Sequence, residues 1–156
     1  MTKEEDVQNE LVKKFDFLKD KVKIQRSRRI FADVAAQDLR SVLDHMIKNM
    51  GFSFLCTITG LDEGSVFGVV YHLSTKDGMI LNLKIRIPKD KPTLETITEY
   101  FPSAEAYERE LMDLFGMQVE GLPKGSRYPL PDDWPAGEFP LRKGWKSKTS
   151  KQEGGI

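Results

Sequence analysis

The sequence predicts an α+β fold: a two-layer domain in which a mostly antiparallel sheet packs against helices, followed by an extended proline- and glycine-rich C-terminal arm. Three observations predict it. Two segments in the first 50 residues repeat apolar residues at steps of three or four, as amphipathic helices do. Three later segments alternate apolar and polar residues between glycine-containing turns, as an antiparallel meander does. After Gly116 both periodicities end, and five of the eight prolines follow.

The N-terminal elements are expected to be a helix, a strand pair and a second helix. Residues 4–20 and residues 39–50 each carry one apolar stripe of helical period. Short strands are expected at 22–25 and 29–34, on either side of a basic run. Gly51 follows the second stripe and is expected to end that helix, since glycine adopts the left-handed conformation at low cost.

The meander is expected over residues 52–59, 66–73 and 80–87, and Pro88 ends its last strand. In the first of these strands, Cys56 alternates with apolar residues, which predicts a small core side chain.

A third helical region is expected from Thr93 to Phe115. Pro102 should break it, and Ser103 is placed to cap its second half.

The chain is therefore divided into an α+β domain (1–116), an extended partner-binding arm (117–145) and a basic flexible tail (146–156). Each large apolar side chain left in water forgoes roughly 1.5–3 kcal/mol of burial. The arm should therefore be packed, partly on its own domain and partly on a neighbouring protein, and its prolines reduce the entropy lost on ordering. The large apolar residues of the arm are Leu122, Tyr128, Leu130, Trp134, Phe139, Leu141 and Trp145.

The composition limits the classes of function. Lysine and arginine together number 24, and so do aspartate and glutamate, so the formal net charge is zero. The excess of positive charge that would indicate a nucleic-acid partner is therefore absent from the composition. A single cysteine can form no internal disulfide and cannot hold an iron–sulfur cluster alone. No apolar run approaches the ~20 residues of a membrane span, so we expect contact with a membrane to be only indirect.

Three carboxylates near the end of the third helical region could carry chemistry. Glu110 and Asp113 are neighbours on a helix, so a stand-alone enzyme that uses them or Glu108 in acid/base catalysis is one hypothesis. The preferred interpretation is structural: Arg109 pairs with Asp113, and Glu110 binds backbone N–H groups of the arm. His45 and His72 lack the companions of a metal motif, and we expect no catalytic, cofactor-binding or metal site. A regulatory module that uses the arm as a recognition segment is a third hypothesis.

Four short sequences in order, E-R-E-L-M-D-L-F-G, E-G-L-P, L-P-D-D-W and P-L-R-K, carry a resemblance to a known family. This compound pattern resembles the 30 kDa subunit family of NADH:quinone oxidoreductase (complex I), which includes the homologous subunit of energy-converting membrane-bound [NiFe] hydrogenases. The resemblance marks these residues as partner-binding: Glu108, Arg109, Glu110, Asp113, Phe115, Gly116, Leu130, Pro131, Asp132, Asp133, Trp134, Pro140, Leu141, Arg142 and Lys143.

The resemblance implies a non-catalytic peripheral-arm subunit on the cytoplasmic side of the cell membrane. Its partners would be the large [NiFe]-hydrogenase-like subunit and the small [4Fe–4S] subunit, which it would dock to support electron transfer. The complex would contain iron–sulfur clusters and either quinone, FMN and NADH or a NiFe site, none of them bound by this chain. Leu122 stands where many complex I members have histidine, and Ser126–Arg127 replaces an Arg-Arg pair, so both branches of the family stay open.

Overall fold

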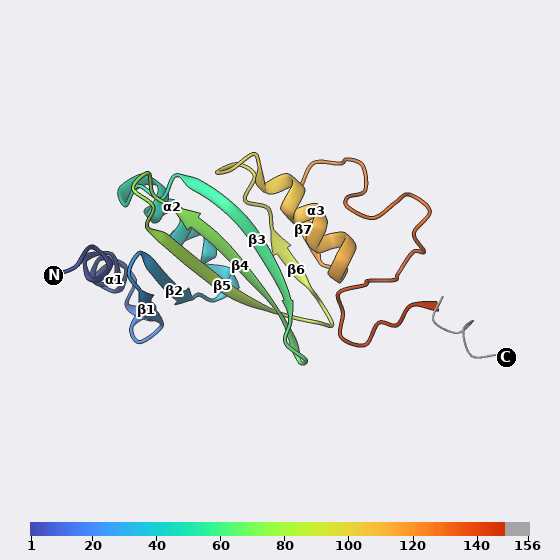
Figure 1. The fold of residues 1–156 in the computed structure, drawn as a ribbon, viewed down its shortest axis with the longest axis horizontal. Coiled ribbons are helices and arrows are strands. Elements are labelled where there is room, and N and C mark those ends of the chain that lie inside the picture. The colour runs from blue at the N-terminus through green and yellow to red at the C-terminus, as the bar shows by residue number, and fades with distance from the viewer. Residues whose placement is uncertain (149–156) are drawn as a thin grey trace.

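A five-stranded sheet with the strand order β1-β2-β5-β4-β3 forms the centre of the fold in the computed structural model, which describes residues 1–148 (Figure 1). As predicted, β3, β4 and β5 form an antiparallel meander, and β1 and β2 form an antiparallel hairpin. β2 runs parallel to β5, which joins the hairpin to the meander. The strands are β1 (Val22–Arg26), β2 (Arg29–Asp33), β3 (Phe54–Asp62), β4 (Val66–Ser74) and β5 (Ile80–Pro88).

Two helices of the N-terminal half accompany this sheet. α1 (Lys3–Lys14) begins with a capping box, in which the N–H of Glu5 donates to the hydroxyl of Thr2 and the N–H of Thr2 donates to the carboxylate of Glu5. It ends before residue 20, and a 3₁₀ turn follows at Asp16–Leu18. α2 (Leu39–Asn49) lies behind the sheet in the view of Figure 1.

The core lies on the face of the sheet that the helices cover. Phe67, Val69, Tyr71 and Leu73 of β4 are fully buried there and pair with buried apolar residues of β5. The opposite face is polar. There Asp33 of β2 pairs with Arg86 of the neighbouring β5, and Glu63, in the turn between β3 and β4, pairs with Lys84 of β5. No helix within residues 1–148 is long and apolar enough to cross a membrane.

The predicted helical region over 93–115 is correct only in its second half. Residues Thr93–Glu95 form a strand, β6, and the helix α3 spans Ala104–Phe115. β6 pairs in parallel with β7 (Gln118–Glu120), so regular structure continues past Gly116, where none was predicted. β-branched residues gather near β6, at positions 93, 96, 97 and 98, and favour a strand, which the apolar spacing did not reveal. Ser103 does occupy the position before α3, but its side chain makes no capping hydrogen bond.

The prediction that Cys56 is a core residue is wrong, because Cys56 is exposed. Leu55 pairs with Leu73 and Thr57 pairs with His72, so Cys56 is the extra residue of a β-bulge in β3. A bulge shifts the alternation of side chains by one residue. Cys56 and Phe54 therefore face outward, while Ile58 is buried.

Candidate partner interface at α3 and the C-terminal arm

The arm of residues 117–145 begins with β7. After β7 it forms no further strand, and it returns past the C-terminal end of α3 (orange to red in Figure 1). Two backbone contacts fix the return. The N–H of Leu141 donates to the carbonyl of Leu114 at 3.1 Å, and the N–H of Lys143 donates to the carboxylate of Asp62 at 2.9 Å. The ammonium of Lys89 also binds Asp62, and these contacts hold the pKa of its carboxyl well below the usual range.

Glu108 is fully buried and ties α3 to the segment after β6. Its carboxylate accepts hydrogen bonds from the N–H of Ile97 at 2.7 Å and from the hydroxyl of Thr96 at 2.6 Å. Burial raises the pKa of the Glu108 carboxyl above its usual 4.5, although the two hydrogen bonds act in the opposite direction. Glu108 is thus a structural group, enclosed away from solvent.

Asp113 ties α3 to the arm at two points. One oxygen accepts from the guanidinium of Arg127 at 3.1 Å, and the other accepts from the N–H of Leu130 at 3.0 Å. Arg127 also donates to the carbonyl of Trp134 at 3.0 Å, so the contact extends along the arm.

The predicted pair of Arg109 with Asp113 is therefore wrong. Arg109 pairs with Glu105, one turn earlier, at 2.9 Å, and it also donates to the carbonyl of Pro123. The arm supplies a different cation for Asp113, and no spacing within the helix could indicate this. Glu110 was expected to bind arm backbone, but its carboxylate forms no hydrogen bond or ion pair within residues 1–148.

Gly116 ends α3 in the left-handed conformation, with φ of +74°. A β-carbon at this position would lie 2.5 Å from the ring of Phe139 and 2.7 Å from the guanidinium of Arg142. That guanidinium stacks between the rings of Phe139 (4.6 Å) and Phe67 (5.2 Å) and donates to the carbonyl of Phe115. The close approach of arm to helix thus requires glycine here.

The two tryptophans of the arm pack on each other, with ring centroids 5.9 Å apart. The indole N–H of Trp134 donates to the carbonyl of Glu138 at 2.8 Å. The carboxylate of Glu138 pairs with Lys148 at 2.5 Å and accepts from Trp145, contacts that lower its pKa. The remainder of the predicted basic tail, residues 149–156, lies outside the described residues.

Three apolar side chains of this region remain in solvent. Leu141 is 51% exposed, Tyr128 is 50% exposed and Met112 of α3 is 36% exposed. Asp132 and Asp133 are also exposed, and neither has an ion-pair partner within residues 1–148. The arm therefore places part of its apolar surface on its own domain and presents part outward.

Several residues that hold the arm were not found from the sequence. Two of them, Arg127 and Glu138, lie in the arm itself, and their partners are not signalled by the motif. The others lie elsewhere in the chain and reach the arm only through tertiary contacts, which no local spacing signals: Asp62, Lys89 and Phe67. His45 pairs with Glu10 at 3.1 Å, and His72 lies within 2.6 Å of Asn82. Within residues 1–148, no group of three or more His, Cys, Asp or Glu side chains could hold a metal ion.

Comparison with known proteins places the chain in a family. Residues 32–151 match the family described as the respiratory-chain NADH dehydrogenase 30 Kd subunit. The chain belongs to this family. A related protein, the C subunit of the F(420)H(2) dehydrogenase of Methanosarcina mazei, is 32% identical over 134 residues, which cover 82% of this chain and 84% of that protein.

Two further family relatives extend the comparison. The C/D subunit of the NADH-quinone oxidoreductase of Methylococcus capsulatus is 32% identical over 126 residues, covering 74% of this chain and 20% of that protein. Among solved structures, a chain of the membrane-bound sulfane sulfur reductase, an archaeal respiratory membrane complex, superposes with a TM-score of 0.84 at 30% identity. That match covers 96% of this chain and 89% of the other.

Proposed function

We propose that this chain is a non-catalytic peripheral subunit of a membrane-associated oxidoreductase complex, on the cytoplasmic side of the cell membrane. The complex would be of the NADH:quinone oxidoreductase type or of the related energy-converting hydrogenase type. The chain would support electron transfer by docking other subunits in a fixed geometry, because electron-transfer rates depend on the spacing of cofactors.

The observation that carries this proposal is the use of the motif carboxylates. Glu108 accepts from the backbone N–H of Ile97, and Asp113 accepts from that of Leu130. These bonds fasten α3 to the segment after β6 and to the arm. A general acid or base needs access to a substrate proton, and Glu108 is fully buried. The acid/base hypothesis for Glu108, Glu110 and Asp113 therefore gains no support from the geometry.

The partners proposed are the large [NiFe]-hydrogenase-like subunit and the small [4Fe–4S] subunit. The name of the Methylococcus relative, a C/D subunit, fits a protein in which this domain is joined to the large subunit. The exposed Tyr128, Leu141 and Met112, with Asp132 and Asp133, form the surface we propose for docking. Iron–sulfur clusters, and either quinone, FMN and NADH or a NiFe site, would reside in the other subunits.

Affinity purification of the tagged full chain from detergent-solubilised membranes tests this proposal. We expect a hydrogenase-like large subunit and an iron–sulfur small subunit to be recovered with it in equal amounts, as quantified by mass spectrometry. A chain recovered as a stable monomer, without a hydrogenase-like large subunit, would contradict the proposal. An accompanying NADH-binding flavoprotein identifies the complex I branch, and a large subunit with two complete C-x-x-C pairs identifies the hydrogenase branch.

A further inference from the structure

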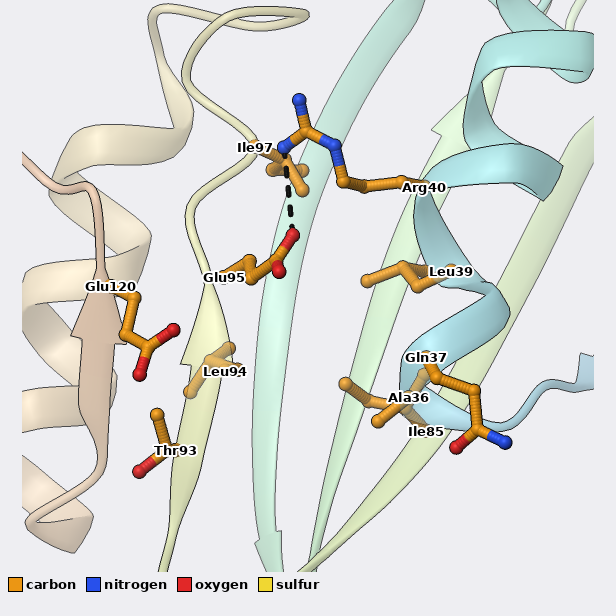
Figure 2. A pocket seen from close by; sticks show the side chains of 10 residues that line it. All are labelled: Ala36, Gln37, Leu39, Arg40, Ile85, Thr93, Leu94, Glu95, Ile97 and Glu120. Atoms are coloured by element: carbon orange, nitrogen blue, oxygen red, sulfur yellow. Dashed lines mark ion pairs between the residues drawn. The ribbon is translucent and has the colours of Figure 1, made fainter.

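A groove separates β6 from the beginning of α2 (Figure 2). Its cavity has a volume of about 240 Å³. Leu39, Ile85 and Leu94 give it apolar walls, and Figure 2 shows Arg40 reaching from α2 toward Glu95 above them.

The edge of β6 that faces away from β7 borders this groove. The carbonyl of Pro92 accepts from the N–H of Gln118, and the N–H of Thr96 donates to the carbonyl of Glu120. In a parallel pair only alternate residues of a strand bond to the neighbouring strand, so residues 93 and 95 direct their backbone groups away from β7. The N–H of residue 93 bonds within its own turn, to the carbonyl of residue 91 at 2.8 Å. The carbonyl of residue 93 and both backbone groups of residue 95 thus form a short strand edge that another extended chain can use.

The rim of the groove carries an excess of negative charge. Arg40 is the cation there, and it already pairs with Glu95 at 3.7 Å and with Glu99. The exposed carboxylate of Glu120, on β7, has no hydrogen-bond or ion-pair partner within residues 1–148. Two carboxylates thus share the Arg40 guanidinium, while Glu120 on β7 stays without a cation among the described residues, and a positively charged group would complement Glu120 and Glu95.

We propose that this groove binds an extended segment of a partner subunit that carries a lysine or arginine. The segment adds a strand to the open edge of β6, and its basic side chain reaches Glu120 and Glu95. The methylene stem of such a side chain suits the apolar walls of Leu94 and Ile85. Small-molecule sites are usually larger, roughly 300–1,000 Å³, so a protein side chain fits the cavity better. This inference rests on the proposed function, because the occupant belongs to the same complex.

Substitutions in the groove test the inference in the complex purified through the full chain. Glu120→Lys reverses the unpaired charge, and Ala36→Trp fills the groove without changing charge. We expect each to reduce the retention of the partner during washing by about tenfold or more, as loss of an interfacial charge pair does. The matched controls, Asp90→Lys and Ala35→Trp, alter exposed residues that do not line the groove and should retain the partner as the natural chain does.

The outcomes separate this inference from the proposed function. Full retention of the partner by both groove variants overturns the groove as a docking site and leaves the proposed function intact. Absence of any partner on the natural chain overturns the proposed function itself. A measurement that needs no variant is hydrogen exchange at the N–H of Glu95, which should be about tenfold slower in the complex than in the isolated chain. Equal exchange rates in the two states would also overturn the added strand.

Discussion

At the scale of single residues, Asp113 is the side chain that joins α3 to two separate points of the arm. Its carboxylate is 13% exposed and accepts from Arg127 and from the N–H of Leu130. Removing it leaves a charged donor and a backbone donor without their acceptor. Such groups are expensive to leave unsatisfied.

Asp113→Ala should therefore lower the free energy of unfolding by about 2–3 kcal/mol. Chemical denaturation of the full chain measures this, and hydrogen exchange at the N–H of Leu130 should accelerate in parallel. Asp132→Ala is the matched control, because Asp132 is exposed and unpaired within residues 1–148, and it should change stability by less than about 0.5 kcal/mol. Equal effects of the two substitutions would show that Asp113 does not anchor the arm.

Glu108 predicts a dependence of stability on pH. Burial raises the pKa of its carboxyl in the folded chain above the usual 4.5. The unfolded chain then releases this proton at lower pH than the folded chain does, so the contribution of Glu108 to stability falls as pH rises from 4.5 through the raised pKa. Glu108→Gln cannot titrate. The free energy of unfolding of the natural chain minus that of Glu108→Gln should decrease over this range, and a difference that grows with pH would contradict the assignment.

At the scale of elements, the sequence predicted what depends on local periodicity. The helix of 39–50, the hairpin and the meander follow from patterns of apolar residues that their own segments contain. The bulge at Cys56 and the strand β6 did not, because each is determined by a neighbour. The pairing of Leu55 and Thr57 with β4 leaves Cys56 outside the alternation, and β6 exists because β7 pairs with it.

The role of the motif residues as an interface stays a prediction. The first stretch of the motif, Glu108 to Gly116, lies on α3 and its C-terminal cap, as a helical reading of that stretch expects. The partners of those residues were not predictable: Arg109 and Asp113 have favourable helical spacing, yet Arg127 from the arm takes the carboxylate. Which of two cations pairs with an acid is decided by tertiary geometry.

Gly116 tests how closely the arm must approach α3. Gly116→Ala places a β-carbon in contact with Phe139 and Arg142, in addition to the cost of its left-handed backbone. Gly137 has a similar φ of +77° but nothing within 4 Å of an added β-carbon. Thermal denaturation should show that Gly116→Ala is more destabilising than Gly137→Ala by about 1–3 kcal/mol, the usual cost of overpacking. Equal losses would mean that the arm yields easily at this point.

At the scale of the whole molecule, the arm has two roles. It covers apolar side chains of its own domain, and it exposes apolar side chains of its own to solvent. The buried ring of Phe67 lies beneath Arg142 of the arm and packs against the buried ring of Phe115, and Phe139 of the arm also stacks on Arg142. A chain that stops after Glu120 keeps every strand but loses this cover.

That truncated chain should stay folded with a lower Tm. Partial exposure of the two rings should cost about 2–3 kcal/mol, which corresponds to a fall of about 5–10 °C for a domain of this size. Circular dichroism of the full and truncated chains measures both the Tm and the retained secondary structure. Complete unfolding at about 25 °C would mean that the arm serves chiefly to hold its own domain together.

The central claim is that the chain organises a complex without taking part in its chemistry. The most direct measurement is the electron-transfer turnover per assembled complex when Glu108→Gln, Glu110→Gln and Asp113→Asn are combined in the chain. The account predicts a lower yield of complex and a turnover within about twofold of the natural complex. Loss of a general acid or base typically costs about 10²- to 10⁴-fold. A fully assembled complex with a turnover reduced to that extent would contradict the account.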